Sequence, residues 1–105
     1  MVTQGAVAQH GAMSTLHIEH PITDYPTWKI AFDKFAPARA EAGVTSYRLR
    51  RPEADEQFIV VDLEFGDVDA AHRFHGFLRD TVWADPGRAP ALAGTPVARV
   101  LVDLS

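Results

Sequence analysis

The strongest constraint on the fold is the order of six short segments, four with strand periodicity and two with helical periodicity. Apolar and polar residues alternate over 14–20, 44–51, 58–65 and 96–104. A period of two is typical of strands that bury one face. The clearest strand is 58–65 (FIVVDLEF), and the loop before it is short enough to predict a hairpin with the preceding strand.

Two segments between these strands repeat apolar residues at spacings of three and four, which predicts amphipathic helices. The first has Thr23 or Asp24 as its N-cap and ends at Gly43, and Pro37 should kink it or end its first half. The second covers 67–80, with its first residue as the N-cap. The buried stripe of the first helix is predicted to contain Trp28, Ala31, Phe32, Phe35 and Arg39.

The order strand–helix–strand–strand–helix–strand predicts an α+β protein with a ferredoxin-like βαββαβ sandwich. This fold has a four-stranded antiparallel sheet with two helices on one face. The segment 81–95 is rich in Pro, Gly and Ala and predicts a loop that can hold one short helical turn at 89–93. We expect residues 14–105 to form a single domain and residues 1–13 to be a flexible N-terminal arm or an expression remnant.

Composition excludes several classes of function. The 105 residues contain no cysteine, which rules out disulfides, thiolate catalysis and cysteine-ligated metal sites. The net charge is −4 and the only basic cluster, Arg48 with Arg50 and Arg51, is short, so we expect no nucleic-acid partner. No stretch approaches the ~18 apolar residues of a membrane span, and the first residues lack the pattern of a secretion signal. We therefore expect a cytoplasmic protein with no membrane partner.

The sheet face turned away from the helices has an unusual predicted composition, because it mixes charged and large apolar residues. Its members are His17, Glu19, Ser46, Arg48, Arg50, Phe58, Val60, Asp62, Glu64, Val97, Arg99, Leu101 and Asp103. A face open to water would not need these apolar residues, and a face under an apolar layer would not tolerate these charges. The mixture favours a homodimer through this sheet face, with charges paired across strands, such as Arg48 or Arg50 with Asp62 or Glu64.

Two runs of sequence, DYPTWKIAFDKFAPAR and VVDLEFGDVDAAHRF, resemble the dimeric α/β-barrel superfamily. The likeness extends over about residues 14–104 and is greatest to antibiotic-biosynthesis-monooxygenase-like proteins, including their uncharacterised actinobacterial members. It implies a homodimer whose two sheets form a dimeric α/β barrel, and small-molecule ligands bound between sheet and helices. The two runs specify a scaffold and contain no catalytic signature.

Cofactor-independent oxygenation of an aromatic or polyketide-like compound needs a base, a cation and aromatic walls. Candidates for all three are present, and each also has a structural explanation as a hydrogen-bonded histidine, an ion pair or a plug at the edge of the core. The predicted catalytic residues are His17, His75 and Arg48. The predicted ligand-binding residues are Tyr47, Trp83, Arg99, Asp62 and His72.

A third class of function involves the second predicted helix, where His72 and His75 are three residues apart and can bring two imidazoles near one metal. Among the resembling proteins, the haem-degrading members carry a haem-contacting histidine there, and they also rely on an Asn in the first strand and a Trp. This chain contains no Asn, and His17 is the nearest polar substitute. We therefore predict no cofactor and no metal, with haem or metal binding as an alternative. An oxygenase and a non-catalytic dimeric ligand-binding or stress-related protein both stay open.

Overall fold

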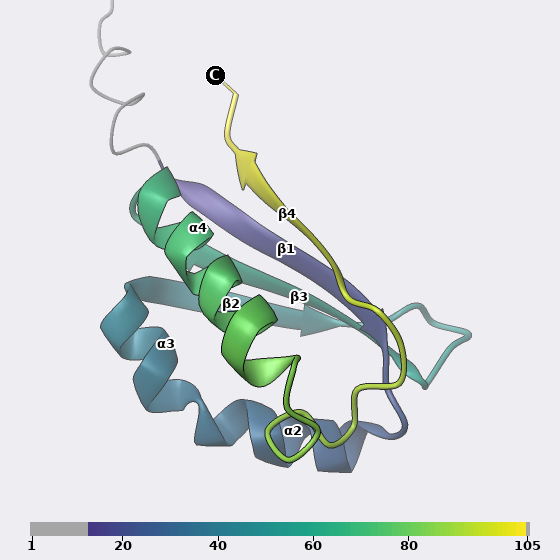
Figure 1. Cartoon of the computed structure of the whole chain (residues 1–105). Helices are drawn as coiled ribbons and strands as arrows, with labels where there is room; N and C mark the ends of the chain where they lie inside the picture. The colour runs from purple at the N-terminus through teal and green to yellow at the C-terminus, as the bar shows by residue number, and fades with distance from the viewer. Residues whose placement is uncertain (1–12, 105) are drawn as a thin grey trace, which may run out of the picture.

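Four antiparallel strands form one sheet in the order β2-β3-β1-β4 in the computed structural model, which describes residues 13–104 (Figure 1). The strands are β1 (Ser14–Pro21), β2 (Val44–Arg50), β3 (Phe58–Phe65) and β4 (Val97–Val102). The strand order and the succession of elements along the chain confirm the predicted ferredoxin-like fold. Apart from Met13, the predicted N-terminal arm lies outside the described residues.

Three α-helices cover one face of the sheet, where two were predicted (Figure 1). They are α2 (Tyr25–Lys34), α3 (Ala36–Ala42) and α4 (Val68–Phe77), and α4 continues into one π-helical turn, η1 (Leu78–Val82). The first predicted helix is divided at Phe35, whose φ of −91° and ψ of 9° are not helical. The cause is Pro37, because a proline ring clashes with the carbonyl four residues earlier. Within residues 13–104, no helix is long and apolar enough to cross a bilayer.

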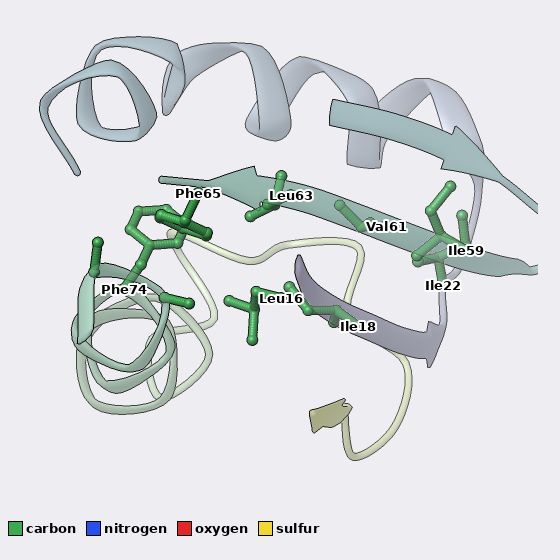
Figure 2. Packing of buried hydrophobic residues seen from close by; sticks show 10 residues of the cluster. Leu16, Ile18, Ile22, Ile59, Val61, Leu63, Phe65 and Phe74 are labelled. Carbon is green, nitrogen blue, oxygen red and sulfur yellow. The ribbon is translucent and has the colours of Figure 1, made fainter. Parts of the chain in front are cut away.

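The core lies between the sheet and the helices, as the strand alternation predicts. Figure 2 shows Leu16 and Ile18 of β1 beside Leu63 and Phe65 of β3, with Phe74 of α4 packed against them. Along β1, buried residues alternate with partly exposed ones, so His17 points to the opposite face of the sheet from these apolar residues. The helix-covered face and the outer face therefore hold separate sets of side chains.

Two local predictions are wrong. The alternation in 96–104 predicts that Val102 and Leu104 share the buried face of the last strand, but both are exposed, because β4 and its pairing with β1 end at Val102. Segment 89–93 forms hydrogen-bonded turns in place of the expected helical turn. A single bridge between Ile22 and Leu92 pairs this segment with the end of β1, and strand pairing excludes a helix there.

Candidate functional site

A cavity of about 80 Å³ lies between the helices and the sheet, and its wall is mostly apolar, with several aromatic rings. The residues that matter for its chemistry are Trp28, Phe32, Phe35, Trp83, His20 and Arg39. The rings of Trp28 and Phe32 are stacked, with centroids 4.9 Å apart and planes inclined by 20°. The cavity can therefore take a flat, apolar group beside these rings.

The sequence builds this wall through helical spacing and one anchored loop. Trp28, Phe32 and Phe35 are three or four residues apart, so they lie on one side of the chain from α2 to the break. The loop after η1 closes the other side, where the backbone N–H of Thr23 donates to the carbonyl of Ala91 at 2.9 Å. The loop can open only by losing contacts with the end of β1.

His20 is the titratable group in this cavity whose side chain is best suited to proton transfer. It is only 4% exposed and lies on the buried face of β1, as its alternation with Leu16 and Ile18 requires. Its Nδ1–H donates to the carbonyl oxygen of Pro21 at 2.9 Å, since a carbonyl can only accept. Burial lowers the pKa of His20, so its ring is neutral near pH 7 and Nε2 holds a lone pair.

Two arginines line the cavity, and Arg39 is the buried one, whereas Arg88 is half-exposed and forms an ion pair with Asp85 at 3.4 Å. Arg39 was predicted to belong to the buried stripe of the first helix, and its side chain is only 6% exposed. Its Cζ lies 3.6 Å from the centroid of the Phe32 ring. Its Nη1 donates to the Phe32 carbonyl at 2.5 Å, near the C-terminal end of α2, and the same carbonyl accepts the backbone N–H of Phe35 at 3.2 Å. Burial lowers the pKa of this guanidinium, which nevertheless stays charged in proteins.

The outer face of the sheet holds a chain of charged hydrogen bonds centred on His17. Its Nδ1 is 2.6 Å from Oδ1 of Asp62 and its Nε2 is 2.9 Å from Oε2 of Glu19. Arg50 Nη2 donates to the other oxygen of Asp62 at 2.6 Å. The bond to Glu19, and then the bond and charge of Asp62, raise the pKa of His17. Both ring nitrogens are engaged by carboxylates, so His17 is suited to act as a bound cation and poorly suited to act as a base.

An open groove of about 530 Å³ runs over this outer face and includes His17, Tyr47, Arg48 and Asp62 in its wall. It is larger than the aromatic cavity. However, its central polar groups are already bonded to one another, so they offer a ligand fewer unsatisfied partners. We therefore take the cavity as the candidate site.

The structure separates the predicted site residues into two groups. His17, Arg48, Arg99 and Asp62 belong to the outer face, where the register places Arg99 and Asp62 on either side of His17. Trp83 lines the cavity, and His75 packs edge-on against it with ring centroids 6.1 Å apart.

The remaining two residues lie at the margins. Tyr47 makes an edge contact with Phe32, with centroids 5.1 Å apart, and His72 is exposed on α4. Within residues 13–104, no three His, Asp or Glu side chains are grouped so as to hold a metal ion. Haem binding through His75 stays a prediction.

Sequence reasoning missed His20 and Arg39 as site residues, although both carried a signal. His20 follows two apolar residues of β1 at a spacing of two, and Arg39 follows Phe35 at a spacing of four. A polar residue in phase with a buried apolar pattern is one that the fold buries. Which polar groups meet Trp83 could not be foreseen, because the path of the loop after η1 depends on contacts distant in sequence.

No protein-family model and no curated protein matches the sequence. Solved structures do match the fold. SnoaB, a cofactor-independent oxygenase from Streptomyces nogalater, is 19% identical, with a TM-score of 0.65 over 89% of this chain and 94% of SnoaB. A proposed antibiotic biosynthesis monooxygenase from Nitrosomonas europaea is 11% identical, with a TM-score of 0.65 over 88% of this chain and 90% of that protein.

A dimeric ferredoxin-like protein from an uncultured marine organism is 15% identical, with a TM-score of 0.56 over 89% of this chain and 98% of that protein. These likenesses show that the chain has the fold of antibiotic-biosynthesis-monooxygenase-like proteins. The resemblance noted in the sequence is confirmed at this level. At such identities the fold alone is shared, and activity has to be argued from the site.

Proposed function

We propose that the chain is a small-molecule-binding, antibiotic-biosynthesis-monooxygenase-like protein that acts as a cofactor-independent oxygenase on an aromatic or polyketide-like compound. The observation that carries the proposal is an apolar cavity between helices and sheet whose wall contains several aromatic rings and a buried histidine. The shared fold with SnoaB, itself a cofactor-independent oxygenase, supports the same reaction class.

The chemistry requires an electron-rich phenol, because a phenolate can reduce O₂ without a cofactor. Nε2 of His20 takes the phenol proton, and the ring carbon para to the oxygen bonds to O₂. Loss of the hydrogen on that ring carbon, with cleavage of the O–O bond, leaves one oxygen as a second carbonyl. The other oxygen leaves as water, which takes up this ring hydrogen as a proton and the proton that His20 returns. A phenol plus O₂ thus gives a quinone plus water, with all four electrons from the substrate. A base positioned in this way is worth about 10²–10⁴ in rate.

The size of the cavity favours a second candidate function. Ligand pockets usually measure at least ~300 Å³, whereas this cavity measures about 80 Å³. A ligand with fused rings would need the loop near Ala91 to move outward. A chain that binds a smaller ligand and performs no chemistry, as a non-catalytic dimeric ligand-binding or stress-related protein, would need no such movement.

Oxygen uptake with 1-naphthol separates the two functions. The oxygenase predicts stoichiometric O₂ consumption and formation of 1,4-naphthoquinone. His20→Gln should lower the rate at least ~100-fold, because an amide cannot accept the proton, while binding measured by tryptophan fluorescence persists. Glu41→Gln, a change at an exposed residue of α3, is the matched control. Binding without uptake supports the non-catalytic candidate, and equal rates for His20→Gln and the unchanged protein contradict the role of His20.

We further propose a homodimer through the outer sheet face. Val97 and Leu101 are exposed there beside the His17–Asp62 bond, and the fold is shared with a dimeric protein. Leu101→Glu should produce a monomer in light scattering at low micromolar concentration, because a new charge would be buried without a partner. Ile30→Glu, at an exposed residue of α2, should leave the dimer intact. A monomeric unchanged protein contradicts the proposal.

A further inference from the structure

The charge balance of the cavity wall is incomplete. Arg39 is 94% buried, and among residues 13–104 no carboxylate lies within ion-pair distance of its guanidinium. Asp33, a carboxylate whose charge reaches it, is bonded to Lys29 at 2.8 Å. Buried charges in proteins are normally paired, because removing a cation from water costs several kcal/mol that contact with rings only partly offsets.

The guanidinium is fixed in place and keeps one edge available. Nη1 is bonded to the Phe32 carbonyl, and Cζ lies 3.6 Å from the Phe32 centroid and 5.4 Å from the Tyr47 centroid. Within the described part of the chain, Nε and Nη2 of Arg39 have no hydrogen-bond partner. Neither nitrogen is completely buried, so both stay accessible to a ligand. These two N–H groups form the planar fork that binds the two oxygens of a carboxylate.

We propose that the cavity, with the loop near Ala91 displaced outward, takes an aromatic carboxylate. Its ring lies beside Trp28 and Trp83, and its carboxylate binds the Nε–Nη2 edge of Arg39. This inference rests on the proposed function, since it assumes that the cavity is the ligand site, and it adds the class of ligand. The carboxylate supplies the negative charge that the described residues do not. Arg39 is then the residue that selects acids over neutral analogues, and His20 remains free for proton transfer.

The test compares 2-naphthoate with its neutral analogue 2-naphthamide. The chain contains two tryptophans, Trp28 and Trp83, and both line the cavity, so quenching of their fluorescence reports binding directly. We expect the acid to bind about 10- to 100-fold more tightly than the amide, as for hydrogen bonds to a charged group. Arg39→Met, which preserves length and apolar contact, should abolish this preference. Arg73→Met, at an exposed arginine of α4, should keep it.

Each outcome bears on the inference. Equal binding of acid and amide by the unchanged protein overturns it and leaves the proposed ligand site standing, whereas no binding of either probe at millimolar concentration overturns both. If Arg39→Met does not fold by circular dichroism, Arg39→Lys tests the same point. It keeps the charge and loses the planar fork, so it should reduce the preference for the acid, and an unchanged preference contradicts the two-point contact.

Discussion

Asp62→Asn should destabilise the protein by an amount that depends on pH. Asp62 receives hydrogen bonds of 2.6 Å from both His17 and Arg50, and its side chain is 12% exposed. The substitution keeps the shape of the residue and removes the charge. The loss therefore measures the charged hydrogen bonds on the outer sheet face.

The magnitude follows from the exposure of the two partners. Breaking a buried ion pair costs about 3–5 kcal/mol when one charge is left unpaired. Arg50 is 53% exposed and returns to water, so its share falls to the ~0.2–1 kcal/mol of a surface pair. His17 is more buried but keeps its bond to Glu19. We expect a loss of about 2–3 kcal/mol in the free energy of unfolding where His17 is protonated.

The loss should shrink as the pH rises. The folded chain holds the His17 proton more tightly than the unfolded chain, because its pKa lies above 6.5. The stability from this proton is therefore complete below pH 6.5 and disappears as the pH rises through the higher folded pKa. At about pH 9 the deficit of Asp62→Asn should fall to about 1 kcal/mol, since a neutral His17 no longer forms an ion pair.

Urea denaturation followed by circular dichroism, at one fixed protein concentration and at about pH 6 and pH 9, measures both values. Asp33→Asn is the matched control, because Asp33 also forms an ion pair but on the exposed surface of α2. Its effect should be much smaller and nearly independent of pH across this range. A deficit for Asp62→Asn that is equal at the two pH values would refute the role assigned to protonated His17.

Three further predictions concern the cavity, the core and the C-terminal end of α3. Burial lowers the pKa of His20, so the stability that its neutral ring contributes above pH 6.5 is lost as the pH falls towards the folded pKa. In thermal denaturation, the stability of His20→Gln should therefore fall less on acidification than that of the unchanged protein. Phe65→Ala removes a fully buried ring and should lower the free energy of unfolding in urea by about 3–5 kcal/mol. Ile30→Ala, on the exposed side of α2, should change it by no more than about 0.5 kcal/mol. Similar costs for the two variants would contradict the assigned core. Gly43→Ala should cost about 1–2 kcal/mol in the same assay, because φ is 97°, a left-handed conformation that strains a residue with a Cβ. An added Cβ meets no other atom, so the cost reports backbone strain alone. Gly43→Asn should cost less, and an equal cost would argue against backbone strain.

Much of the fold could be predicted because period and order are local properties of the sequence. The alternation in 58–65 predicted β3 and its two faces, and Asp24, Pro37 and Gly43 predicted the start, the break and the end of the helical region. The cavity was harder, because its wall combines residues from α2, α3, β1 and a loop without periodicity. The contacts of Trp83 with His20 and His75 depend on where the loop after η1 closes, which no local sequence pattern indicates.

A crystal structure of the protein with 2-naphthoate bound tests the proposed ligand site most directly. We expect ring density between sheet and helices, in contact with Trp28 and Trp83, with the carboxylate on Arg39. Density confined to the groove around His17 and Arg48, or a cavity that stays filled by its own side chains at saturating ligand, would contradict it.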